Sequence, residues 1–228
     1  MARILLIETS TAQLSTALAE DGVVKSFRIC DEPRMQAALT APYVKEVLEG
    51  LSVKDLDAVC VGKGPGSYTG LRVGVSTAKG LCFGAGIPLL SAGTLDVLVS
   101  EAHRLGVVPD GCRHIVPMVD ARRMEVYTAV FTPDGRQLTE TAPVIVDADS
   151  FAAELAAGPV LFIGDGALKC REVLSSENAF FAEAFPTAMA MAPLAEAAYM
   201  QKRFEDVAYF EPFYLKDFVA TVSRKKLF

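Results

Sequence analysis

Residues 61–72 of the chain read VGKGPGSYTGLR. An apolar segment, Leu56–Val61, comes directly before this glycine-rich stretch, and the pattern after it predicts a helix from about Tyr68 to Phe83. A glycine-rich turn between a strand and a helix offers backbone N–H groups at the positive end of the helix dipole, so it can hold a phosphate. The common nucleotide fingerprints do not fit, because Lys63 is not followed by Ser or Thr and the glycines lack the dinucleotide-binding spacing. Two interpretations stay open: an unusual anion site, or a tight structural turn that brings two elements together.

The predicted helix carries four glycines in two pairs, Gly70 with Gly74 and Gly80 with Gly84. Glycine costs about 1 kcal/mol in a helix interior, so four of them in one helix need a reason. Small residues four apart form a flat face that another backbone can approach closely. That backbone belongs either to the protein's own sheet or to a helix of a second subunit. In the second case we expect the preceding helix, Met35–Leu51, to take part as well.

The sequence before the glycine-rich stretch predicts three strands, followed by the helix Met35–Leu51. The strands are Ile4–Ile7, Leu14–Ala19 and Val23–Ile29, and an Asp-Gly pair between the last two is a strong hairpin signal. Pro42 lies within the helical pattern, so the helix either kinks there or begins near Thr40, which would serve as its N-cap.

The second half of the chain repeats this order. Asp120 ends its first strand as Glu8 ends the first strand of the chain, and the turn residues Asp21 and Asp134 follow these acids by 13 and 14 residues. We interpret this as a duplicated strand–hairpin–helix–strand–helix unit, divided into residues 1–106 and a smaller half, 107–228, with a terminal helix and tail. The helix Gly93–Leu105 would connect the halves. The second copy consists of the strands His114–Val119, Met124–Phe131 and Leu138–Thr141, a helix Ser150–Ala157 capped by Ser150, the strand Val160–Ile163, and the loop Gly164-Asp165-Gly166.

The composition excludes several classes of protein. The chain has 228 residues, a formal charge of −6 and only two histidines, His103 and His114. An acidic chain is a poor autonomous nucleic-acid binder, since neutralising phosphates needs clustered Lys and Arg. The five cysteines include no C-x-x-C pair, which disfavours a disulfide framework and a zinc site. We expect a cytoplasmic, reduced protein with no signal peptide and no membrane span.

The residues leave little room for catalysis. Gly74–Ala78 only partly resembles a nucleophile elbow and lies inside the predicted helix, and the two histidines lack metal-ligand spacing. We therefore predict no catalytic residue and no metal ligand. The best acidic pair for a Mg²⁺–phosphate site is Glu8 with Asp120, each at a strand end. With the second glycine loop, this pair leaves open an ATPase or kinase that acts alone in the cleft between the halves.

Taken together, these segments resemble the TsaB (YeaZ) family of the actin/sugar-kinase/Hsp70-like ATPase superfamily. GPGSYTGLR is highly specific for that family, and the other blocks are weak singly but strong together. The matching blocks keep the family order over nearly the whole chain: IETST at 7–11, GPGSYTGLRVG at 64–74, GTL at 93–95, VDARR at 119–123, EVY at 125–127 and EPFYL at 211–215. The resemblance implies an α/β, ribonuclease H-like fold with two duplicated subdomains.

The resemblance also implies a function. TsaB proteins are non-catalytic partners of TsaD, which transfers threonylcarbamoyl to N6 of adenosine 37 in tRNAs that read codons beginning with A, and TsaE is a further component. TsaD-like proteins hold their metal with an H-x-x-x-H pair, which this chain lacks. The chain is thus expected to bind TsaD, to form a homodimer when alone, and to meet tRNA only through the complex. Alternatives are a stand-alone ATPase or kinase and, less favoured, a glycoprotease-like metallopeptidase.

The family's interface and nucleotide residues map onto named positions of this chain. The interface set, for TsaD or for a second copy, is Gln36, Leu39, Tyr43, Ser67, Gly70, Leu71, Gly74, Thr77, Ala78 and Leu81. The weaker nucleotide set is Glu8, Thr9, Ser10, Thr11, Asp120, Gly164 and Gly166. No resident cofactor is expected, although the family leaves open ATP or ADP with Mg²⁺ at the TsaB–TsaD junction.

Three positions depart from the family pattern. Glu8 stands where the family usually has Asp, Gln36 where a His is common, and Met124 where a glycine is usual. All three changes weaken autonomous ATP binding, and none alters the interface glycines. The basic stretch Ser223–Lys226 is either a tRNA contact within a complex or a solvated terminus.

Overall fold

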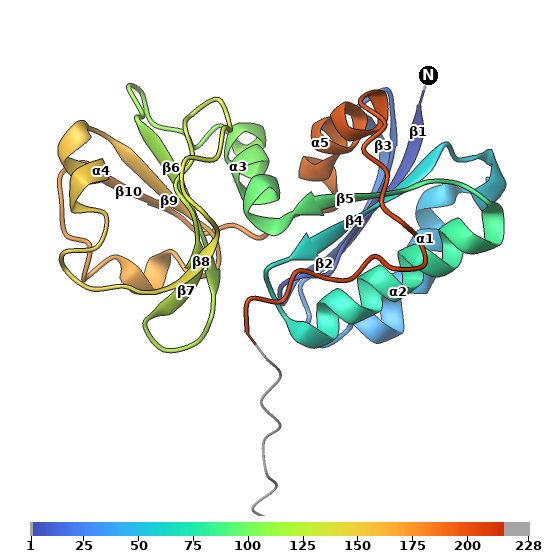
Figure 1. The fold of residues 1–228 in the computed structure, drawn as a ribbon, viewed down its shortest axis with the longest axis horizontal. Helices are drawn as coiled ribbons and strands as arrows, with labels where there is room; N and C mark the ends of the chain where they lie inside the picture. Colours follow the sequence, from blue (N-terminus) through green and yellow to red (C-terminus); the bar gives the residue numbers. More distant parts are fainter. Residues whose placement is uncertain (1, 217–228) are drawn as a thin grey trace, which may run out of the picture.

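The computed structural model describes residues 2–216, and the basic stretch near the C-terminus lies outside these residues. The chain forms two five-stranded sheets side by side (Figure 1). The first sheet has the order β3-β2-β1-β4-β5, in which β1–β2 and β2–β3 are antiparallel and β1–β4 and β4–β5 are parallel. Its strands are β1 (Arg3–Glu8), β2 (Leu14–Glu20), β3 (Val23–Cys30), β4 (Ala58–Gly64) and β5 (Leu89–Gly93).

The second sheet repeats this arrangement in the same sequence order. Its order is β10-β9-β6-β7-β8, in which β6–β7 and β7–β8 are antiparallel and β6–β9 and β9–β10 are parallel. Each strand of the second sheet therefore has a counterpart in the first, which confirms the predicted duplication. The strands are β6 (His114–Asp120), β7 (Glu125–Thr128), β8 (Ala142–Ile145), β9 (Val160–Ile163) and β10 (Ala179–Ala182).

Helices cover both faces of the first sheet (Figure 1). On one face, α1 (Gln36–Leu48) and α2 (Tyr68–Ala85) bury Val47 and Ala78 against Leu5 and Ile7 of β1. The alternate β1 side chains point to the opposite face, because successive residues of a strand project to opposite sides. There, Ile4 and Leu6 pack with residues of α5 (Ala188–Met200).

The remaining helices join or cover the second half. The helix α3 (Thr94–Leu105) lies between the two halves, with Val97 in the core of the first and Leu95 and Leu98 in the core of the second. The short elements are α4 (Ala152–Ala157) and the 3-10 turns η1 (Val53–Asp55) and η2 (Leu168–Cys170). No helix within residues 2–216 is long and apolar enough to cross a membrane.

After β10 the chain returns to the first half. The terminal helix expected in the second half is α5, and it packs on the first sheet. Residues 205–216, which we call the strap, continue along that half: Glu205 donates its N–H to the Leu89 carbonyl at 2.8 Å, and Phe213 donates to the Lys63 carbonyl at 2.7 Å. The predicted boundary between residues 106 and 107 therefore assigns α5 to the second half. The contacts of α5, however, are with the first sheet.

Several predicted element boundaries need correction. The helix α1 does not begin near Thr40. It starts at Gln36 and runs through Pro42, and Thr40 lies inside it and donates its hydroxyl proton to the Gln36 carbonyl at 2.5 Å. The Ser150 hydroxyl bonds Asp147 instead of capping α4. The third strand of the second half is β8 and not Leu138–Thr141, because the register with β7 pairs Tyr127 with Pro143. The short strands β5 and β10 were not predicted.

Candidate functional site

The segment Glu8–Thr11 leaves β1 and is almost wholly buried. The loop before α2 closes over it: Ser67 donates its N–H to the Ser10 carbonyl at 2.6 Å. The Thr9 hydroxyl donates to the Gly70 carbonyl at 2.8 Å, and the Ser10 N–H donates to Glu8 Oε1 at 2.6 Å. Thr9 and Ser10, two members of the predicted nucleotide set, therefore form a packing contact with the start of α2.

Four glycines at four-residue spacing make this close packing fit. A Cβ added at Gly62 would lie 2.3 Å from Glu8 Oε2, and one at Gly66 would lie 2.2 Å from the Ser10 carbonyl oxygen. A Cβ at Gly70 would lie 2.1 Å from the Thr9 carbonyl oxygen, and one at Gly74 would lie 2.3 Å from Thr9 Oγ1. Cβ atoms do not approach other heavy atoms so closely. The geometry favours the tight structural turn. Gly70 is approached by the backbone of Thr9 and Gly74 by the Thr9 side chain, so both glycines face the protein's own chain.

Glu8 is fully buried, and its carboxylate lies next to Gly62 of β4. Burial raises the pKa of its carboxyl from 4.5 to about 7, against the opposing effect of its bonds to Ser10 and Thr9. Its Oε2 has no hydrogen-bond partner within residues 2–216. A carboxyl that is largely protonated below neutrality and lies under Gly62 is a poor Mg²⁺ ligand.

The counterpart of Glu8 in the second half has a different environment. The Asp120 side chain is 45% exposed and pairs with the Lys169 ammonium. Asp120 Oδ1 also accepts the Arg122 N–H at 2.9 Å, and the Asp120 N–H donates to Asp165 Oδ1 at 2.9 Å. Burial raises the pKa of Asp165 to about 6. The two carboxylates proposed as a Mg²⁺ pair are thus in unlike states, one buried and one already neutralised by a lysine.

The second glycine loop also packs on its own sheet. A Cβ at Gly164, whose φ is +135°, would lie 2.1 Å from the Met118 carbonyl oxygen of β6. Gly166 donates its N–H to the same carbonyl at 3.0 Å. Gly164 and Gly166 therefore serve the β6–β9 contact in this structure.

Within residues 2–216 no three His, Cys, Asp or Glu side chains are grouped so that they could hold a metal ion. The His103 ring bonds the Pro133 carbonyl at 2.7 Å on the surface, and His114 begins β6.

The ten predicted interface residues fall into three groups. Four are buried inside the first half: Gly70, Leu71, Gly74 and Ala78. Gln36 is also buried, with its amide donating to the Thr11 carbonyl at 2.9 Å. Leu39, Tyr43, Thr77 and Leu81 are half-buried, and Ser67 is exposed as the N-cap of α2. A Gly74→Leu substitution would place its side chain against Thr9 and disturb the fold.

The outer face of α2 carries a different set. Arg72, Ser76, Gly80, Phe83 and Gly84 are exposed on it, and the Phe83 side chain is 84% exposed. Unlike Gly70 and Gly74, neither Gly80 nor Gly84 has any other atom near the position that a Cβ would take. The second glycine pair of the predicted small-residue face thus points to solvent. Arg72, Ser76 and Phe83 escaped the sequence prediction, although their spacings of four and seven residues mark them as one helical face.

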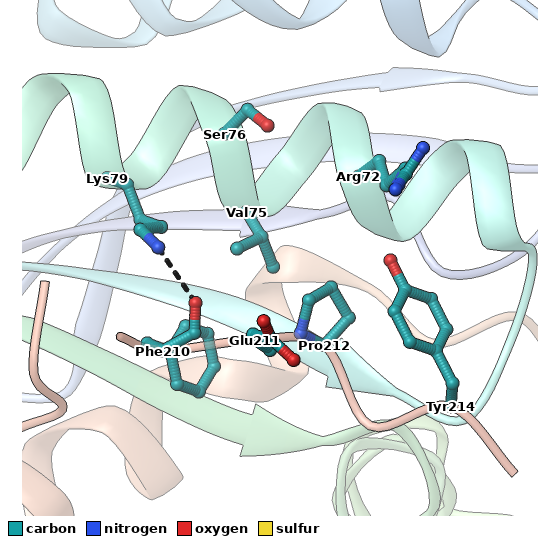
Figure 2. Close-up of a pocket in the computed structure, with 8 residues that line it drawn as sticks. All are labelled: Arg72, Val75, Ser76, Lys79, Phe210, Glu211, Pro212 and Tyr214. Carbon is teal, nitrogen blue, oxygen red and sulfur yellow. Dashed lines mark hydrogen bonds between the residues drawn. The ribbon is translucent and has the colours of Figure 1, made fainter. Parts of the chain in front are cut away.

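The strap lies against this helix and makes a pocket with it (Figure 2). The Lys79 ammonium donates to the Ala208 carbonyl at 3.1 Å and to the Phe210 carbonyl at 2.8 Å. The Tyr214 ring packs on the Tyr68 ring with centroids 4.9 Å apart. At its end, the Lys216 ammonium pairs with Glu125 of β7, so the strap reaches from α2 to the second half.

Comparison with known proteins gives consistent matches. The family model described as "TsaD: tRNA N6-adenosine threonylcarbamoyltransferase" matches residues 37–223. The chain is 28% identical over 235 residues, 98% of this chain and 96% of the relative, to the Haemophilus influenzae "tRNA threonylcarbamoyladenosine biosynthesis protein TsaB". It is 38% identical over 135 residues to the Escherichia coli protein of that name, and that match spans 58% of this chain and 56% of the relative.

A solved structure has the same fold over nearly the whole chain. It is "YeaZ from Pseudomonas aeruginosa", with a TM-score of 0.82, 25% identity, and coverage of 94% of this chain and 100% of that one.

Proposed function

The chain belongs to the TsaB (YeaZ) family, and on that premise we propose that it acts in tRNA threonylcarbamoyladenosine biosynthesis as a scaffold subunit that binds TsaD and supplies no catalytic residue. Its duplicated sheets are the actin/sugar-kinase/Hsp70-like fold that the resemblance implied. Within the complex, TsaE and tRNA are engaged through TsaD and not by this chain alone.

The observation that carries the docking proposal is the outer face of α2. Gly80 and Gly84 lower the stability of the helix by about 1 kcal/mol each relative to alanine, and no neighbour among residues 2–216 needs their small size. Phe83 between them exposes a large apolar side chain to solvent, where burial by a partner would be favourable. A partner helix that packs on this face accounts for both features.

The environments of Glu8 and Asp120 support a role without catalysis. Glu8 is buried and partly neutral, and Asp120 is paired with Lys169. We infer that the isolated chain neither binds nor hydrolyses MgATP, and that any nucleotide is held only where TsaD completes the site. Calorimetric titration with MgATP, with an Asp120→Ala variant as control, tests this. Turnover by the pure chain that is lost in Asp120→Ala would instead favour the stand-alone ATPase.

The docking face is tested by Gly80→Leu. The leucine has room in the free chain but would project into a partner packed on α2, so we expect affinity for TsaD to fall at least about tenfold. Ala156→Leu on the exposed surface of α4 is the matched control, and both variants should unfold in urea as the wild type does or later.

Measuring TsaD binding by Gly80→Leu and by the wild type separates the docking face from the scaffold function. Gly80→Leu should also abolish self-association in size-exclusion chromatography, if the homodimer uses this face. Unchanged TsaD affinity would show that the outer face of α2 is not the docking site. No TsaD binding by the wild type, and no modified tRNA when it is added to TsaD and TsaE, would overturn the scaffold function itself.

A further inference from the structure

The pocket between α2 and the strap has a volume of about 280 Å³ (Figure 2). We call it the α2–strap pocket. One wall is the outer face of α2 and the other is the strap, from Phe210 to Tyr214. It is lined by Arg72, Val75, Ser76, Lys79, Phe210, Glu211, Pro212 and Tyr214.

Arg72 is the preorganised group of this pocket. Its guanidinium carbon lies 4.5 Å from the centroid of the Tyr68 ring, and that ring packs in turn on Tyr214. Stacking holds a guanidinium in place while leaving the N–H groups at its edge able to donate. No residue from 2 to 216 accepts a hydrogen bond from the Arg72 side chain or pairs with it. A fixed guanidinium without an acceptor is suited to a carboxylate from outside the chain.

The other polar groups leave the pocket with a positive balance. Lys79 contributes a second positive charge, although two of its three N–H groups already bond strap carbonyls. The exposed Ser76 hydroxyl lies one turn after Arg72 on α2. Glu211 is the one carboxylate among the lining residues, so two cations face one anion in a chain whose formal charge is −6. Local charge of the opposite sign to the rest of the molecule favours an acidic occupant.

The position of the pocket indicates where that acid comes from. Arg72 and Ser76 continue the exposed face of α2 that also carries Gly80 and Phe83. A protein that packs on the glycines would therefore pass directly over the pocket. Arginine and tyrosine are also the residues that most often dominate the energy of protein interfaces.

We propose that the α2–strap pocket receives an Asp or Glu side chain of TsaD, whose carboxylate accepts two N–H groups of Arg72. The strap is then part of the docking surface. This inference rests on the proposed function, because it assigns a contact within the same complex.

Charge reversal at Arg72 tests the proposal. We expect Arg72→Glu to weaken TsaD binding at least about tenfold by calorimetry, with a smaller dependence of affinity on salt than the wild type shows. Arg136→Glu, at an exposed turn of the second half, is the matched control and should bind as the wild type does. Circular dichroism and urea unfolding check that Arg72→Glu is folded. A Lys substitution at one surface Asp or Glu of TsaD should then restore binding to Arg72→Glu and to no other variant.

The outcomes are distinct. Equal affinities of wild type and Arg72→Glu overturn the proposal, even if Gly80→Leu weakens binding and so supports the docking face. A pocket that binds inorganic phosphate at millimolar concentration, while Arg72→Glu keeps its TsaD affinity, is a small-anion site and also overturns it. Absence of TsaD binding by the wild type removes the proposed function and this contact together.

Discussion

Glycines in one helix have opposite roles in this protein. A Cβ at Gly70 would lie 2.1 Å from the Thr9 carbonyl oxygen, whereas a Cβ at Gly80 would meet nothing. We expect Gly70→Ala to lower the free energy of unfolding by about 1–3 kcal/mol, because backbone must move to admit the methyl group. Gly80→Ala should raise it by about 0.5–1 kcal/mol through helix propensity. Urea unfolding of this matched pair measures both. Equal midpoints for the two variants would contradict the inward orientation of Gly70.

Glu8 makes stability depend on pH at the scale of one residue. Its pKa is about 7 in the folded chain and near 4.5 in the unfolded chain, so the folded state holds the proton more tightly between these values. The free energy of unfolding should therefore fall as pH rises from about 4.5 to 7. Glu8→Gln keeps the acceptor for the Ser10 N–H and removes this titration. We expect its stability relative to the wild type to rise over that range by up to about 3 kcal/mol, as measured by urea unfolding at several pH values. A constant difference would mean that Glu8 is ionised in the fold.

At the scale of elements, α2 contacts the first sheet, α1, the Glu8–Thr11 segment and the strap, and its outer face is exposed to solvent. Lys79 is its main link to the strap, through carbonyls of Ala208 and Phe210. Hydrogen bonds from a charged group contribute roughly 1.5–3 kcal/mol each. We expect Lys79→Met to speed amide exchange of residues 208–214 at least about tenfold, while Lys45→Met on α1 leaves it unchanged. Equal exchange in both variants would mean that the backbone bonds of the strap suffice to hold it.

At the scale of the molecule, the two sheets share one strand order but are covered by different helices. The first sheet needs α5, which comes from the end of the chain, to bury Ile4, Leu6 and Leu90. Each such side chain contributes roughly 1.5–3 kcal/mol when buried, and a domain has only about 5–15 kcal/mol in total. We expect residues 1–106 alone to show no cooperative unfolding transition. Joining them to residues 184–216 through a flexible linker should restore one, as followed by circular dichroism in urea. A cooperative transition of 1–106 alone would show that α5 is dispensable.

Much of this architecture was predictable from local signals. An apolar run predicted β1, and alternation of apolar residues with the Asp-Gly turn predicted β2 and β3. The repeat of that order predicted the duplicated sheets. The strands β5 and β10 were missed because segments of five and four residues are too short to show a distinctive period. The exposed residues of α2 were recoverable from helical spacing, but nothing in that spacing says which face is covered.

The sequence by itself determined the family, the duplicated sheets and the scarcity of metal-binding side chains, because these depend on residue types and on periods of two and 3.6 residues. Only the tertiary structure decided that Gly70 and Gly74 face Thr9 while Gly80 and Gly84 face solvent. It also decided that Glu8 is buried and that α5 and the strap return to the first half. These outcomes depend on contacts between residues more than fifty positions apart, and local pattern holds no record of such distant neighbours.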